Sequence, residues 1–308
     1  MSERDELEKA MELAMQGSRS DARDAVLRLE PRIKEPGLRL QLIDVAQSVL
    51  HNVKDNAKKA ALSVEGAKIA EAIGRIDLQS HFMAITADLM MLQVALWHHN
   101  RTMLKIAPRW FEFATESDKN EHESLATLIE HRESEIDTLL SQAVSHSKRS
   151  GDKKIQASVL MSMGSIESAR YQRYKMDCMR GVRAKLWTMF KFIHYPFFEY
   201  LLTFWNGDGQ KLNAHVKSFT TSFLTAARLA SDIGDPLAAH AYYNLAVHLK
   251  SAYRFGAAKR CLAKARIIAL KHNDAALILQ LEKLEQYIKE KNKDIPDYLS
   301  GETREFNE

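Results

Sequence analysis

The stretch that decides the fold runs from Ala239 to Leu270 and reads AHAYYNLAVHLKSAYRFGAAKRCLAKARIIAL. Its large apolar residues recur at helical spacing on both sides of a short break near Gly256. This periodicity is typical of amphipathic helices, and it predicts one helix over 236–253 and a second over 255–272. Because the connection between them is so short, the two helices are expected to pack together as a helical hairpin.

This hairpin resembles a tetratricopeptide repeat. The family places large residues at repeat positions four, seven, eleven and twenty-four, which are here Tyr242, Leu245, Leu249 and Leu262. It places small residues at positions eight, twenty and twenty-seven, and these are here Ala246, Ala258 and Ala265. The small residues let the helices approach closely, while the large ones fill the space between them. Leu270 stands where the family commonly has proline, and Gly256 comes later than the usual turn glycine.

Outward from this hairpin, the first-helix half of a second unit matches at Ala157, Leu160, Met163 and Gly164. Five alanine-rich segments also end in a polar stop that contains an aspartate: Asp77, Asp118, Asp152, Asp235 and Asp274. An aspartate in such a stop can accept hydrogen bonds from the free N–H groups that begin the next helix. Gly151 and Gly234 suit the left-handed exit of the preceding helix. The spacing of the stops predicts hairpins of about 40 residues that must stack to bury their apolar faces.

The composition agrees with long helices. The chain has 308 residues, of which 45% are hydrophobic and 27% are charged, with only 12 Gly and 6 Pro. These values exclude disorder, collagen-like sequence and a disulfide scaffold, and they leave too few turn residues for an all-β chain. A further helix is predicted over 38–72, where apolar residues recur every three or four positions.

The sequence therefore predicts an all-α fold, and the resemblance implies a right-handed tetratricopeptide-like superhelix of about six hairpins. We expect a single solenoid domain over 1–293. It would comprise irregular N-terminal hairpins over 1–150, a long basic helix and an aromatic segment over 153–206, and the best repeat-like unit over 236–272. Residues 294–308 are expected to form an acidic tail.

The cysteines and the longest apolar run indicate the compartment and whether the chain spans a membrane. Cys178 and Cys261 are the only cysteines, and their separation matches no metal or redox motif. The longest apolar run, 189–205, is interrupted by charged residues and by Pro196, so no membrane span is expected. A soluble protein of the reducing cytoplasm is the expectation.

A basic stripe is the most polarised part of the chain. Between Arg170 and Lys191 there are seven basic residues and one acidic residue. On a continuous helix, five of them share one face: Arg170, Arg173, Arg180, Arg183 and Lys191. The stripe predicts either a face for phosphate, nucleic acid or an acidic peptide, or a solvated outer helix surface.

An aromatic segment adjoins the stripe. Nine of the chain's 25 aromatic residues lie between Trp187 and Trp205. They would suit a stacking platform for single-stranded nucleic acid, an interfacial membrane contact, a partner groove, or core packing between layers.

The family resemblance also implies a concave binding face. Positions two, five, nine, twelve and thirteen of a tetratricopeptide repeat commonly meet peptide ligands, and Asn244 at position six adds an amide that can pair with a peptide backbone. The alternative role of this face is packing against the next hairpin. The candidate residues are His240, Tyr243, Asn244, Val247, Lys250 and Ser251.

No catalytic motif is present. The twelve histidines include no HExxH pair, and the chain has no phosphate-binding glycine loop and no GxSxG. We therefore expect no enzyme activity, no cofactor and no metal. The expected function is a scaffold or adaptor that binds a protein or peptide, with an acidic partner favoured by the stripe. The alternative is a regulator that binds nucleic acid or another acidic ligand through Arg170–Lys191.

Overall fold

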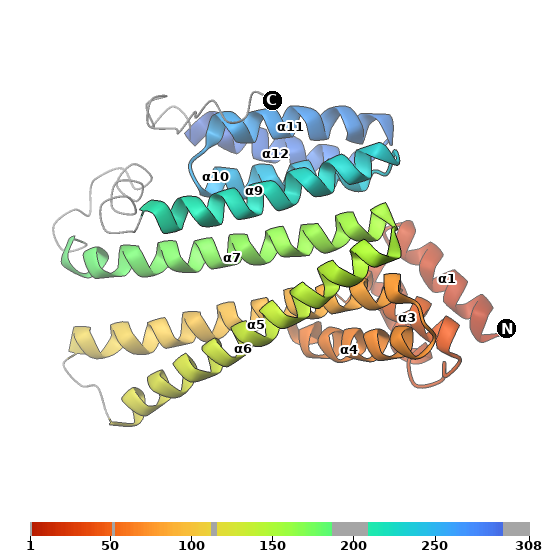
Figure 1. The fold of residues 1–308 in the computed structure, drawn as a ribbon, viewed down its shortest axis with the longest axis horizontal. Coiled ribbons are helices and arrows are strands. Elements are labelled where there is room, and N and C mark those ends of the chain that lie inside the picture. The colour runs from red at the N-terminus through yellow and green to blue at the C-terminus, as the bar shows by residue number, and fades with distance from the viewer. Residues whose placement is uncertain (1, 51–52, 112–115, 187–208, 292–308) are drawn as a thin grey trace. The chain divides into compact units, whose positions relative to one another are not determined.

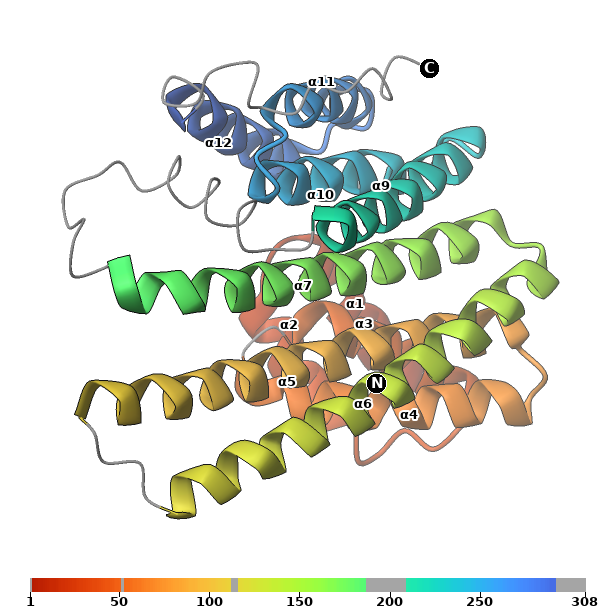
Figure 2. The same ribbon diagram turned by 60° about the vertical axis from the view of Figure 1, so that its left-hand side comes forward.

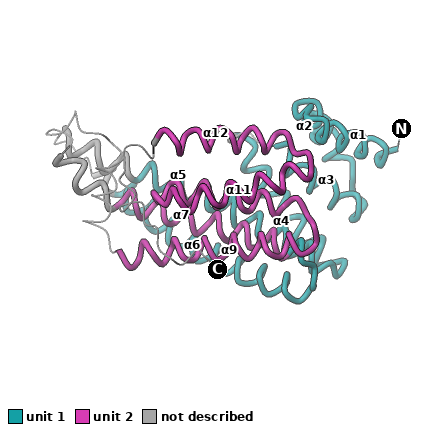
Figure 3. The backbone as a smooth tube through the Cα atoms, turned by 90° about the horizontal axis from the view of Figure 1, so that it is seen from above, with its two compact units in different colours: residues 1–155 teal, residues 156–308 magenta. Residues whose placement is uncertain are grey.

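A computed structural model describes residues 2–50, 53–111, 116–186 and 209–291 (Figure 1). Within these ranges every regular element is a helix, and no strand occurs. The predicted all-α fold class is therefore confirmed for the described chain. Contacts divide the protein into two compact units, Met1–Ile155 and Gln156–Glu308, which Figure 3 colours separately. The prediction of one continuous solenoid over 1–293 concerns how these units are arranged, so it stays a prediction.

Unit 1 begins with three short helices and ends with two long ones. Ser2 starts the first helix with a capping box, because its side chain accepts from Asp5 N–H while the Asp5 carboxylate accepts from Ser2 N–H. Pro36 starts the third helix, where its missing N–H costs nothing. The helices are α1 (Glu3–Met15), α2 (Arg19–Leu29), α3 (Pro36–Val49), α4 (Asn56–Ala72), α5 (Ile76–Phe111) and α6 (Glu116–Ser150), with a short 3-10 turn at Val53–Asp55.

The predicted helix over 38–72 is wrong, because α3 and α4 are separate helices. The chain leaves helical geometry after Val49 and turns at Val53–Asp55. Asp55 is buried in this turn and accepts two hydrogen bonds from the Arg23 guanidinium, at 3.0 and 3.2 Å. The buried carboxylate has a bidentate partner on α2, and this contact fixes the turn. It outweighs the local apolar spacing, which favours a continuous helix.

Unit 2 contains α7 (Lys153–Leu186), α9 (Gly209–Asp232), α10 (Leu237–Ser251), α11 (Phe255–Lys271) and α12 (Ala275–Lys291), as Figures 1 and 2 show. Three of the predicted aspartate caps are present. Asp152 accepts from the N–H groups of Lys154 and Ile155, Asp235 from Leu237 N–H and Asp274 from Leu277 N–H. Gly151 and Gly234 have φ values of 72° and 66°, so the predicted left-handed exits are confirmed.

The remaining two aspartates lie inside helices. Asp77 belongs to the first turn of α5, where its carboxylate pairs with Arg75 at 2.6 Å. Asp118 lies within α6, which begins at Glu116, so no helix starts after it.

The core of unit 2 contains the residues on which the family resemblance depends. Leu245, Ala246 and Leu249 of α10 are fully buried, as are Ala258 and Ala265 of α11. On the α7–α9 side, a Cβ placed on Gly164 would lie 2.8 Å from the Phe223 ring. Small residues therefore allow close helix approach both between α10 and α11 and between α7 and α9, as the sequence pattern indicates.

Candidate functional site

The predicted concave face lies on α10, and its six residues share one side of that helix. All six are half-buried: His240, Tyr243, Asn244, Val247, Lys250 and Ser251. The opposite side of α10 faces the core with Leu245, Ala246 and Leu249. The structure thus groups the candidates as the repeat positions imply.

The next helix, α12, contacts part of this face. His240 Nε2 lies 3.3 Å from the Asp274 carboxylate at the start of α12, and Lys250 Nζ lies 4.7 Å from the centre of the Tyr287 ring. Burial lowers the pKa of Lys250 below its ordinary value. Both contacts agree with the alternative role of this face, which is packing against the next hairpin. Among the described residues, the Asn244 amide has no hydrogen-bond partner.

At the start of the basic stripe, a carboxylate balances the charge of Arg170. Arg170 donates to Glu167 at 2.7 Å, and the other Glu167 carboxylate oxygen lies 3.2 Å from His215 Nδ1. Burial opposes ionisation of Glu167, but hydrogen bonds from His215 and Arg170 outweigh it and hold its pKa below the ordinary value. The side chains of Arg180 and Arg183 lie outside the described residues, as do Lys191, the aromatic segment and the acidic tail. The nucleic-acid function of the stripe therefore stays a prediction.

Sequence reasoning did not find a serine–histidine contact in the core of unit 2. Ser168 Oγ of α7 lies 2.6 Å from His248 Nδ1 of α10. The His248 ring stacks on the Phe223 ring, with 5.4 Å between the two ring centroids. Burial lowers the pKa of His248 to about 4, and the nearby charge of Lys250 acts in the same direction. Ser168 is only 1% exposed, which denies a substrate access to its oxygen. The pair is a satisfied polar contact between helices and not a hydrolytic site. No local signature could have revealed it, because 80 residues separate the two.

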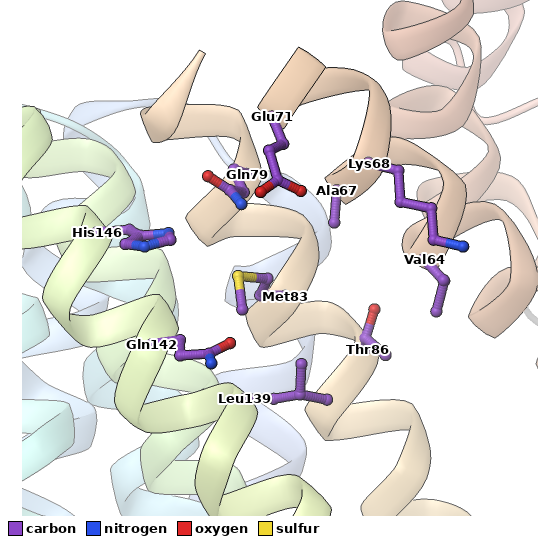
Figure 4. Close-up of a pocket in the computed structure, with 10 residues that line it drawn as sticks. All are labelled: Val64, Ala67, Lys68, Glu71, Gln79, Met83, Thr86, Leu139, Gln142 and His146. Atoms are coloured by element: carbon purple, nitrogen blue, oxygen red, sulfur yellow. The ribbon is translucent and has the colours of Figure 1, made fainter. Parts of the chain in front are cut away.

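A shallow groove crosses unit 1 between α4 and α6, with α5 as its floor (Figure 4). It encloses about 360 Å³ and lies within Met1–Ile155. Its apolar lining comes from Val64 and Ala67 of α4, Met83 of α5 and Leu139 of α6, with the polar side chains of Lys68, Thr86 and Gln142 among them. At one end Glu71, Gln79 and His146 point toward one another from the three helices.

The polar end of the groove offers unsatisfied hydrogen-bonding capacity. His146 Nδ1 is buried and has no hydrogen-bond partner among the described residues. A buried polar atom without a partner costs free energy; because this nitrogen has almost no accessible surface, the imidazole must rotate before a ligand in the groove can supply the partner. The groove therefore combines apolar contact area with a few polar groups, a combination that is typical of ligand-binding sites.

A second hollow of about 410 Å³ in unit 1 lies among α1, α3 and α5. Met11 and Met15 of α1 border it and are 38% and 79% exposed. His81 of α5 lies 3.4 Å from the Asp44 carboxylate across it. This hollow is more open than the α4–α6 groove, and the two methionines that border it are flexible side chains.

The described residues contain no cluster of three histidine, cysteine or acidic side chains that could hold a metal ion. Burial raises the pKa of the Cys261 thiol to about 11, so it is protonated and unreactive at neutral pH. No described helix combines the length and the apolar character needed to traverse a lipid bilayer. A search of protein-family models found no match for the chain. A comparison with curated proteins found no significantly similar sequence.

Proposed function

We propose that this chain is a non-enzymatic scaffold that binds a peptide or protein segment, and that its helices form a tetratricopeptide-like solenoid. The observation that carries the binding proposal is the groove over α5, because apolar side chains from α4, α5 and α6 line it together with the polar side chains Glu71, Gln79 and His146. The close-packed small residues of α10 and α11 support the repeat assignment. The right-handed superhelix of six hairpins and the cytoplasmic location belong to the same proposal.

The chemistry of the groove defines the segment it would take. An aliphatic side chain fits beside Val64, Met83 and Leu139. A backbone N–H or C=O group placed near Gln79 and His146 would then satisfy the polar end. Binding of this kind needs only a preformed surface and displaced water, and it requires no chemical step.

Selection of a random peptide library against the full-length protein would test the proposal. Leu139→Glu replaces an apolar side chain of the groove with a charge and should weaken binding of the selected peptides about tenfold or more. Leu128→Glu is the matched control, because Leu128 is also on α6, is 45% exposed and does not line the groove. Equal loss with both variants, or no selected peptide at all, would contradict a peptide-binding groove.

The α10 face is tested in the same assay. Asn244→Ala and Lys250→Ala should leave groove-directed peptides unaffected. Peptides that lose affinity only with these two variants would assign binding to α10, and the scaffold function would then rest on unit 2.

A further inference from the structure

The outer face of α11 is unusually basic. This helix, Phe255–Lys271, contains five basic residues and no acidic residue. All five are exposed: Lys259, Arg260, Lys264, Arg266 and Lys271. Figures 1 and 2 show α11 at the side of unit 2 remote from α7.

An apolar strip runs between these charges. Ile267 is 70% exposed and Leu270 is 55% exposed, and Ala263 is also exposed. At 100° per residue these three occupy the centre of the solvent-facing arc. Lys259 and Arg266 lie along one edge of the strip, while Arg260, Lys264 and Lys271 lie along the other. The opposite side of α11 supplies Ala258, Leu262 and Ala265 to the core, so its orientation is fixed by packing.

We propose that the outer face of α11, defined by Ala263, Ile267, Leu270 and the five flanking basic residues, binds the surface of a membrane that contains anionic lipids. In this arrangement Ile267 and Leu270 enter the boundary between headgroups and acyl chains. The lysine and arginine side chains extend along both flanks to the lipid phosphates and carboxylates. The contact is peripheral and places no helix across the bilayer.

The charge and the apolar strip together favour a membrane over other anionic partners. A nucleic acid would satisfy the basic residues but would gain little from an aliphatic strip, and no aromatic residue on the exposed arc offers a stacking surface. Arg266 forms ion pairs with Glu282 at 3.6 Å and with Glu285 at 3.3 Å. Those pairs are exposed and therefore weak, so a dense anionic surface can replace them.

Flotation of the full-length protein with lipid vesicles tests the proposal. Binding is expected to vesicles of phosphatidylcholine with phosphatidylserine, and to fall steeply with salt. Vesicles of phosphatidylcholine alone should bind far less. Replacing two flanking lysines, Lys259→Gln with Lys271→Gln, should weaken binding about twenty-fivefold, at about fivefold for each lysine near the surface.

The apolar strip is tested separately. Ile267→Asn with Leu270→Asn should weaken vesicle binding about tenfold or more while the helical circular dichroism stays unchanged, because both side chains are exposed. Leu279→Asn on α12 is the matched control, since Leu279 is 53% exposed and lies on another helix. Its affinity should equal that of the unaltered protein.

Three results would overturn the proposal. One is no binding to phosphatidylserine vesicles at low salt. Another is vesicle binding that is unchanged by the Ile267 and Leu270 substitutions. The third is tight binding of a labelled single-stranded oligonucleotide that depends on Lys259 and Lys271 but not on Ile267 and Leu270, which would assign the face to nucleic acid.

Discussion

Replacement of His248 should remove a defined part of the pH dependence of unit 2. The imidazole is enclosed by Ser168, Phe219 and Phe223, and burial lowers its pKa from 6.5 to about 4. The folded state therefore favours neutral His248. Its contribution to stability is complete above pH 6.5 and is lost as the pH falls from 6.5 towards 4.

The magnitude follows from the two pKa values. At about pH 5.5 the unfolded imidazole is mostly protonated and the folded one is not, which lowers the free energy of unfolding by about 1.4 kcal/mol relative to about pH 7.5. The full difference near pH 4 is about 3 kcal/mol. The milder pH is the better choice, because carboxylates with lowered pKa values, such as Glu167, still keep nearly all of their contribution there.

Urea unfolding, monitored by pulsed hydrogen exchange in peptides from α10, measures this change in the free energy of unfolding of unit 2. Wild-type protein should lose about 1.4 kcal/mol between the two pH values beyond whatever the His248→Gln variant loses. An imidazole titration observed by NMR should place the His248 midpoint near pH 4. If wild type and variant show the same pH dependence, or if the imidazole titrates near 6.5, then the enclosure of His248 does not govern its ionisation.

Three more changes have clear expected outcomes. Gly164→Ala should cost about 1–3 kcal/mol in urea unfolding, because the new methyl group would press on the Phe223 ring at 2.8 Å. Arg39→Ala should cost about 1.5–3 kcal/mol, because it removes hydrogen bonds of 2.7 and 2.8 Å from a buried guanidinium to Glu65, whose carboxylate is 41% exposed and regains part of the loss from water. Asp88→Asn should stabilise unit 1 above neutral pH, since removal from water raises the pKa of Asp88 to about 7; this gain should shrink as the pH falls towards 3.8.

Matched control variants separate these effects from a nonspecific loss of stability. Gly209→Ala adds a methyl group with nothing within 4 Å and should leave the urea midpoint nearly unchanged. Arg32→Ala removes a partly exposed pair with Glu6 and should cost less than about 1 kcal/mol. A cost for Arg32→Ala equal to that for Arg39→Ala would contradict the role assigned to burial, and an Asp88→Asn gain independent of pH would contradict the stated ionisation.

The local parts of the fold were predictable from sequence. The α10–α11 hairpin follows from apolar periodicity, and the caps at Asp152, Asp235 and Asp274 follow from short polar stops. Each of these features depends on residues within one or two helical turns. The break between α3 and α4 was not predictable in this way, because it depends on Asp55 meeting Arg23 from another helix.

The same distinction between local and long-range contacts applies to the candidate sites. The α10 residues could be placed on one face from their spacing, but spacing could not show that α12 would reach His240 and Lys250. The groove over α5 has no sequence signature at all. It arises because α4 and α6 pack on α5 while leaving space between them, and His146 belongs to no motif.

The polar contacts of α7 have a consequence for the order of folding. Glu167 reaches His215 across 48 residues, Ser168 reaches His248 across 80, and Lys175 reaches the Ser251 carbonyl across 76. By contrast, α10, α11 and α12 are neighbours along the chain and close only short loops. Because long loops cost more entropy to close, we expect α10 and α11 to form the nucleus and α7 to dock after the rate-limiting step. Ser168→Ala should then speed unfolding while leaving the refolding rate almost unchanged.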